Sequence, residues 1–119
     1  MSRAATALAA SLAASGVLHF ARPRPFDGIV PRSLPGSPRL WTYLSGAAEL
    51  TVAAAVAYPP TRRLGGLAAA GLFTAVFPAN VKMAADWRRA SPVLGAIGYA
   101  RLPFQIPLIW WGLRVARRS

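Results

Sequence analysis

Four long apolar runs, separated by short polar or proline-rich segments, dominate the chain. They cover residues 4–20, 41–58, 64–84 and 96–113, and each holds 17 to 21 residues with few charges. At a rise of about 1.5 Å per residue, a helix of this length crosses a hydrocarbon layer of about 30 Å. The pattern therefore predicts an all-α fold, an integral membrane four-helix bundle that forms one domain over residues 1–119.

The first run follows Arg3 and has the charge, length and small residues of a secretory signal peptide. Ser11, Ser15 and His19 recur in it every four positions, so they share one helical face. A cleaved signal sequence needs no polar stripe of this kind. We therefore expect a retained first helix and keep the signal peptide as the alternative.

The proline-rich loop, residues 21–40, contains five prolines that exclude a regular helix across it. Apolar side chains lie between the prolines, and their exposure to water would be unfavourable. We expect part of this loop to fold over one end of the bundle as a cap, with a disordered linker as the alternative. The residues of the expected cap are Phe26, Asp27, Ile29, Val30 and Leu34.

The connection between the second and third runs, Pro59–Arg63, is so short that these helices must form an antiparallel hairpin. Four spans place both termini on one side. Basic residues are nearly balanced between the two sides but are denser in the shorter segments beside the termini, so we expect cytoplasmic termini. Trp110 and Trp111 precede Arg114 at the end of the last run, as in an interfacial aromatic belt.

Composition supports a membrane protein of a bacterium. Hydrophobic residues make up 55% of the chain and charged residues only 14%, whereas about a quarter of a soluble domain is charged. One lysine against thirteen arginines, with abundant Ala, Gly and Pro, is typical of a GC-rich bacterial genome. We therefore expect a multi-pass protein of the bacterial cytoplasmic membrane.

The net charge of +11 does not indicate a nucleic-acid partner, because the arginines lie at the ends of apolar runs, where they meet lipid headgroups. The chain has no cysteine, which excludes thiol redox chemistry and thiolate metal sites. A single histidine and three acidic residues supply too few ligands for a heme or metal site.

Five polar residues lie within the runs or at their ends, in one half of the predicted bilayer: His19, Glu49, Asn80, Arg101 and Gln105. An ionisable group at this depth costs about 2.5–3.5 kcal/mol, so it needs a partner or a function. Glu49 is the acid inside the runs and Arg101 the clearly embedded base, and we expect them to form an ion pair. The cluster is either interhelical hydrogen bonding or a polar pocket under the cap, in which His19 is available for proton transfer.

Prolines and small residues surround this cluster. Pro78, Pro103 and Pro107 each remove a helical amide donor, so we expect kinks there and carbonyl groups free to accept hydrogen bonds. A stripe of small residues on the third run predicts close helix packing, and it consists of Gly66, Ala70 and Thr74.

Five short segments occur along the chain in a characteristic order and spacing: Gly16–Phe20, Phe26–Pro31, Ser45–Leu50, Phe77–Asn80 and Arg101–Gln105. Together they resemble the DoxX-like family of small bacterial membrane proteins. The resemblance implies a four-helix membrane fold, with the five polar residues at the polar positions of the family's pattern. Some relatives are associated with quinone-linked thiosulfate oxidation, and others with redox homeostasis or maturation of redox enzymes.

We therefore expect a DoxX-like membrane protein that binds a quinone or another small ligand, or acts as an accessory subunit in a redox or cell-envelope process. We expect no enzymatic activity of its own, no catalytic residue, and membrane lipid and another membrane or envelope protein as partners. The alternatives are a proton-coupled exporter and a purely structural subunit of a larger complex. The exporter is disfavoured because a Glu49 carboxylate held by Arg101 is poorly suited to exchanging protons near neutral pH.

Overall fold

The computed structural model describes residues 2–119, and over these residues the chain is all α-helical, which confirms the predicted class. The six longer helices are α1 (Arg3–Ala21), α3 (Pro38–Ala57), α4 (Arg62–Ala75), α5 (Phe77–Ala90), α6 (Pro92–Arg101) and α7 (Gln105–Arg117). One turn of helix, α2 (Arg24–Asp27), and two 3-10 turns, η1 (Pro59–Thr61) and η2 (Leu102–Phe104), lie between them.

Three helical stretches in this part of the chain are long and apolar enough to cross a membrane. They are Arg3–Ala21, Pro38–Ala57 and Pro59–Ala90, the last of which runs through η1, α4 and α5. The fourth predicted run, 96–113, is divided between α6, η2 and α7.

The helix breaks follow the prolines. The predicted helix over 64–84 is divided at Val76, just before Pro78, and the predicted helix over 96–113 is divided at η2, which contains Pro103. Pro107 causes no break because it lies in the first turn of α7, where an amide N–H has no partner within the helix.

Serine followed by proline begins two of the helices. Ser37 precedes Pro38 at the start of α3, and its hydroxyl accepts a hydrogen bond from the Leu40 N–H at 3.2 Å. Ser91 precedes Pro92 in the same way at the start of α6. Serine caps free amide groups at a helix start, and proline tolerates the first position because its missing N–H would be unpaired there. This signal places the start of α3 three residues before the predicted one.

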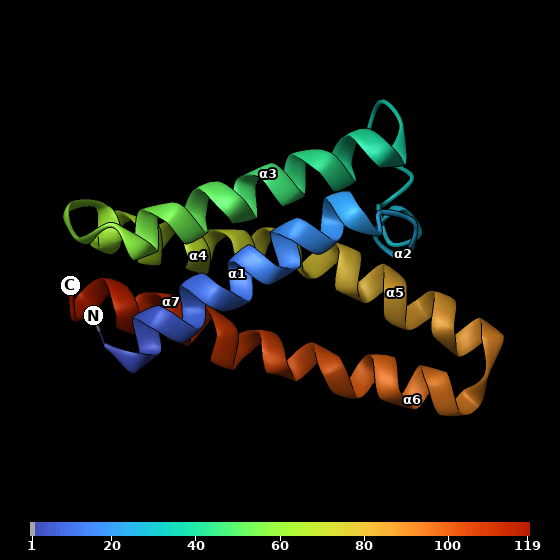
Figure 1. Ribbon diagram of the computed structural model, residues 1–119. Coiled ribbons are helices and arrows are strands. Elements are labelled where there is room, and N and C mark those ends of the chain that lie inside the picture. The colour runs from blue at the N-terminus through green and yellow to red at the C-terminus, as the bar shows by residue number, and fades with distance from the viewer. Residues whose placement is uncertain (1) are drawn as a thin grey trace.

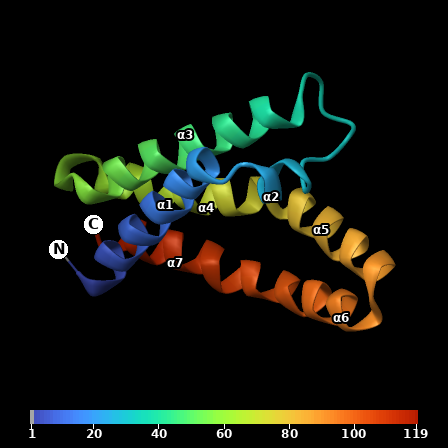
Figure 2. The same ribbon diagram turned by 45° about the vertical axis from the view of Figure 1, so that its right-hand side comes forward.

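The helices pack mainly in pairs, α1 with α3, α4 with α7 and α5 with α6. The start of α1, the end of α7 and the α3–α4 turn lie at one end of the molecule, and α2 and the α5–α6 turn lie at the other (Figure 1). Both views place α6 on the side away from α3 (Figures 1 and 2). The α5–α6 pair therefore diverges from the α1–α3 pair.

Glycines allow the helix backbones to approach closely. A Cβ atom at Gly66 of α4 would lie 2.6 Å from the Ala116 nitrogen of α7, and one at Gly112 would lie 2.8 Å from the Ala70 nitrogen. The predicted packing stripe is thus confirmed for Gly66 and Ala70, whereas Thr74 donates its hydroxyl hydrogen to the Ala70 carbonyl of its own helix. The apolar core is formed around Leu8, Leu12, Val56, Ala69 and Val115.

Candidate functional site

The crossing of α1 and α3 places His19 and Glu49 next to each other. A Cβ atom at Gly46 would lie 2.7 Å from the His19 Cβ, and one at Gly16 would lie 3.0 Å from the Gly46 carbonyl oxygen. His19 and Glu49 each follow one of these glycines by three positions, so each shares a helical face with its glycine. Two small residues thus bring the two ionisable side chains together.

His19 is 6% exposed, and its Nδ1 lies 2.6 Å from the Ser15 carbonyl oxygen. Because a carbonyl oxygen can only accept, Nδ1 carries the proton and donates it to this hydrogen bond. The same nitrogen lies 3.6 Å from Glu49 Oε2, which is too far for a hydrogen bond but close enough for an ion pair when the ring is protonated. Nε2 of His19 makes no hydrogen bond within residues 2–119.

The Glu49 carboxyl group contains a buried oxygen, Oε2, that lacks a hydrogen-bond partner among the described residues. The Glu49 side chain is 12% exposed. A buried polar atom without a partner costs about 1–3 kcal/mol, and more if it is charged, so such an atom requires an explanation.

The proline-rich loop places an aromatic ring on His19 of this pair. Phe26 of α2 stacks on His19 with a distance of 3.8 Å between ring centroids and an angle of 21° between ring planes. Ile29 and Val30 are half-buried, whereas Leu34 is exposed. Phe26 of the loop therefore packs against α1, whereas Leu34 remains exposed.

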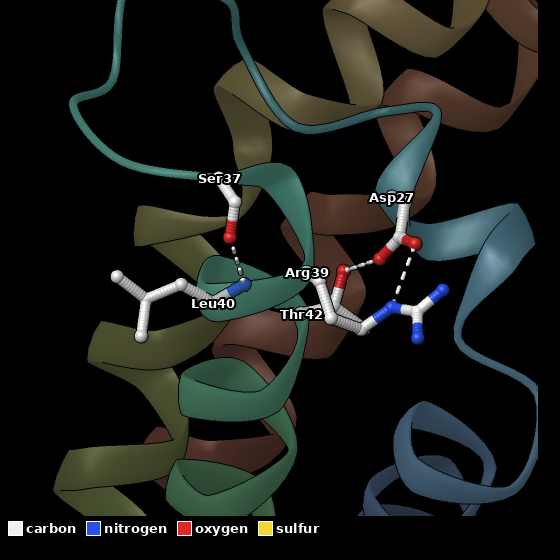
Figure 3. A network of polar contacts seen from close by, with 5 residues as sticks. All are labelled: Asp27, Ser37, Arg39, Leu40 and Thr42. Atoms are coloured by element: carbon white, nitrogen blue, oxygen red, sulfur yellow. Dashed lines mark hydrogen bonds and ion pairs between the residues drawn. The ribbon is translucent and has the colours of Figure 1, made fainter.

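Asp27 ties the loop to the start of α3 (Figure 3). Its carboxylate accepts hydrogen bonds from the Thr42 hydroxyl at 2.6 Å and from Arg39 Nε at 2.9 Å. The Thr42 hydrogen bond and, after it, the Arg39 guanidinium hold the pKa of Asp27 below its usual value. Lys82 of α5 adds a second attachment, because its Nζ donates to the Gly28 carbonyl at 2.8 Å.

Gln105, at the start of α7, is the centre of a second polar group. It is 2% exposed, and its Nε2 donates to the Phe73 carbonyl oxygen at 2.6 Å. Its Oε1 accepts from Asn80 Nδ2 at 3.2 Å and from an Arg101 guanidinium nitrogen at 3.3 Å. The Phe73 carbonyl lies at the break between α4 and α5, so Gln105 supplies a donor where the helix does not continue.

The predicted pair of Glu49 and Arg101 does not form: no ion pair or hydrogen bond joins them within residues 2–119, and the five predicted residues fall into two groups. His19 and Glu49 form one group, and Asn80, Arg101 and Gln105 form the other. The cause is the divergence of the helix pairs, because Arg101 ends α6, which packs on α5 and lies away from α3 (Figures 1 and 2).

Sequence reasoning missed three contacts of the site: the Ser15 carbonyl, the Thr42 hydroxyl and the Lys82 ammonium group. Ser15 was found as part of a polar stripe, but its backbone rather than its side chain contacts His19. The positions of Thr42 and Lys82 give no signal in the sequence, because their partners lie 15 and 54 residues away.

The chemistry available at the His19–Glu49 pair is hydrogen bonding and proton exchange. The carboxylate can accept from a hydroxyl or N–H group, and Nε2 of a neutral His19 can accept as well. Within residues 2–119 no three His, Asp or Glu side chains lie close enough together to ligate one metal ion. The pair is therefore suited to an organic headgroup or to a proton.

The chain has no significant match to a curated protein or to a solved structure. Residues 8–116 match a family described as a domain of unknown function, DUF8561. This match covers all or part of each of the seven helices, including both polar groups, and the chain therefore belongs to the DUF8561 family.

Proposed function

We propose that this chain is a DoxX-like integral membrane protein that binds a small ligand with a polar headgroup, such as a quinone, at the His19–Glu49 pair. In this proposal it serves as an accessory subunit in a redox or cell-envelope process of a bacterial cytoplasmic membrane. The proposal rests on one observation, the buried Oε2 of Glu49, which has no hydrogen-bond partner among the described residues, beside a histidine with an unused nitrogen.

Four membrane spans are proposed, namely α1, α3, α4 with α5, and α6 with α7. The first three correspond to the stretches that are long and apolar enough to cross a membrane. The α6–α7 unit returns alongside α5 and α4, so the start of α1 and the end of α7 lie at the same end of the molecule (Figure 1). An even number of spans accounts for this arrangement, and the arginines near the chain ends favour cytoplasmic termini.

A hydroxyl-bearing headgroup suits the unpartnered oxygen. A quinol hydroxyl would donate to Glu49 Oε2 and remove the cost of leaving this acceptor unpaired. Since His19 uses Nδ1 for the Ser15 carbonyl, Nε2 remains for the ligand. The Phe26 ring adds an aromatic surface next to the pair, and a flat headgroup can stack on such a surface.

The second polar group, centred on Gln105, stabilises the break between α4 and α5 and takes no part in the proposed ligand site. Gln105 uses both ends of its amide, one for the Phe73 carbonyl and the other for Asn80 and Arg101. This group is the interhelical hydrogen bonding that was the structural alternative for the whole cluster. The proposed ligand site is thus confined to α1, α3 and the cap.

A binding measurement on the full chain in lipid nanodiscs tests the proposal. The probe is decylubiquinone, reduced to its quinol, and binding is followed by quenching of tryptophan fluorescence. Glu49→Gln should weaken binding about 10- to 100-fold, which corresponds to about 1.5–3 kcal/mol for one hydrogen bond to a charged group. Thr51→Val is the matched control, because Thr51 lies on the exposed face of α3 and bonds only within its own helix. Equal affinities for the two variants would contradict the proposal and favour the purely structural subunit.

Proton-coupled export is a second candidate, and the partner of Glu49 favours it. The objection to this function was a carboxylate held by Arg101, but the structure places His19 there instead. An imidazole can both accept and donate a proton, whereas a guanidinium stays charged, so this pair suits proton exchange. Proteoliposomes with a proton gradient should then show substrate efflux that is lost in Glu49→Gln and retained in Thr51→Val. Gradient-independent ligand binding without efflux would exclude this candidate.

A further inference from the structure

We infer that the end of α7 binds the phosphodiester headgroup of an anionic membrane phospholipid. The site is a surface hollow of about 400 Å³ lined by Trp110, Arg114, Arg117 and Arg118, which we call the α7 hollow. It is separate from the His19–Glu49 pair and depends only on the proposed placement of the chain in a membrane.

Positive charge in the α7 hollow is not compensated by acidic side chains. All three acidic side chains of the sequence, Asp27, Glu49 and Asp86, form their ion pairs with other residues, and none pairs with an arginine of the hollow within residues 2–119. Three guanidinium groups therefore line one hollow, and they complement the negative charge and the acceptor oxygens of a phosphodiester.

Arg114 is held in position before any lipid binds. Its guanidinium carbon lies 5.2 Å from the centre of the Trp110 ring, as in a cation–π contact. Its Nε is buried and has no hydrogen-bond partner among the described residues, although it is a strong donor. A group fixed in this way loses little conformational freedom when an acceptor such as a phosphate oxygen binds.

An apolar stripe continues from the hollow along the same face of α7. Ile106 and Trp110 precede Arg114 by eight and four positions, so the three side chains share this face. Ile106 is 72% exposed and Trp110 is 50% exposed. An acyl chain can lie along Ile106 and Trp110 while the headgroup reaches the arginines, and this apolar extension favours a lipid over a free anion.

A second hollow of about 400 Å³ at the opposite end of the molecule provides a comparison. It is lined by Arg22, Arg24 and Arg39, together with alanine and proline residues. Arg39 is neutralised there by Asp27 at 2.9 Å, and the lining contains no tryptophan. This hollow should therefore bind an anionic lipid more weakly than the α7 hollow.

The test is native mass spectrometry of the full chain in uncharged detergent, titrated with phosphatidylglycerol or with phosphatidylcholine of the same acyl chains. Wild type should retain one phosphatidylglycerol in preference to phosphatidylcholine. Arg114→Gln with Arg117→Gln should weaken this binding about 25-fold, or about fivefold per arginine. The matched control, Arg22→Gln with Arg24→Gln, removes the same charge at the other end and should change the affinity less than twofold.

Three results would overturn the inference: equal losses in the two double variants, equal binding of the two lipids by wild type, or displacement of phosphatidylglycerol by inorganic phosphate. The last result would indicate a site for a free anion.

If the variant that lacks Arg114 does not fold, the double variant Arg117→Gln with Arg118→Gln is used in its place, because both of these side chains are exposed and Arg114 is retained. This variant should also lose affinity by about 25-fold.

Discussion

Replacing Gly46 by alanine tests whether the close approach of α1 and α3 builds the His19–Glu49 site. The added methyl group would lie 2.7 Å from His19 Cβ, 2.9 Å from a Phe20 ring carbon and 3.2 Å from the Gly16 carbonyl oxygen. The nearest atom is bonded directly to the backbone of α1, so no side-chain rotation can relieve the overlap. We expect α1 to move away from α3 and the distance between His19 and Glu49 to increase.

The expected magnitude comes from a comparison with Gly71 of α4. A methyl group at Gly71 would meet no atom within 4 Å, so Gly71→Ala changes only the helix propensity, by about 1 kcal/mol in favour of the helix. Gly46→Ala gains the same propensity but also suffers overpacking, which typically costs about 1–3 kcal/mol. The free energy of unfolding should therefore be about 1–3 kcal/mol lower for Gly46→Ala than for Gly71→Ala.

Reversible unfolding in mixed micelles with increasing SDS, followed by circular dichroism, measures this difference. The slope of the transition should be the same in both variants, since a change in slope would indicate a different unfolded state. Equal free energies of unfolding for Gly46→Ala and Gly71→Ala would refute the close crossing of α1 and α3.

Two further predictions concern the residues around the site. Gln105→Ala leaves the buried Phe73 carbonyl without its hydrogen-bond donor, and each buried group left unpaired should lower the free energy of unfolding by about 1–3 kcal/mol. The same SDS titration measures this loss. An unchanged free energy of unfolding would show that Gln105 does not stabilise the helix break. The pKa of Asp27 is lowered in the folded protein, so its carboxylate stabilises the folded loop. This stabilisation is fully present above the unfolded-state pKa of about 4 and is lost as the pH falls through the folded-state pKa. Protection factors of the loop amides, which are exchange rates corrected for their intrinsic pH dependence, should thus fall below about pH 4 in wild type and be low at every pH in Asp27→Asn. Wild-type protection factors that do not change with pH would contradict this role.

The sequence predicts the helical class and most of the local structure, because these depend on short-range patterns. The apolar runs give the helices, and the prolines at 78 and 103 mark both breaks. The small residues Gly66 and Ala70 identify the α4–α7 contact. The α3 helix begins three residues before the apolar run, because Ser37 and Pro38 form a helix start that does not depend on hydrophobicity.

The pairing of the polar residues was harder to predict. Glu49 is the acid within the apolar runs and Arg101 is the more deeply embedded base, and their positions along the runs place them in the same half of the molecule. The position of a residue along its helix does not determine which neighbouring helix its side chain faces. The breaks at Val76 and at η2 direct α5 and α6 away from α3, so His19 and not Arg101 becomes the neighbour of Glu49.

The most direct test of the proposed site is the ligand-dependent stability of Glu49→Leu. The measurement is the free energy of unfolding with and without decylubiquinol at 100 times its dissociation constant. Wild type should gain about 2.7 kcal/mol from the ligand. Glu49→Leu should gain only about 0.4–1.4 kcal/mol from the same ligand concentration, as a 10- to 100-fold loss of affinity implies. Without ligand it should be about 1–3 kcal/mol more stable than wild type, because the unpaired buried oxygen is gone. A variant that is less stable than wild type, with no ligand effect in either protein, would show that Glu49 serves the fold and not a ligand.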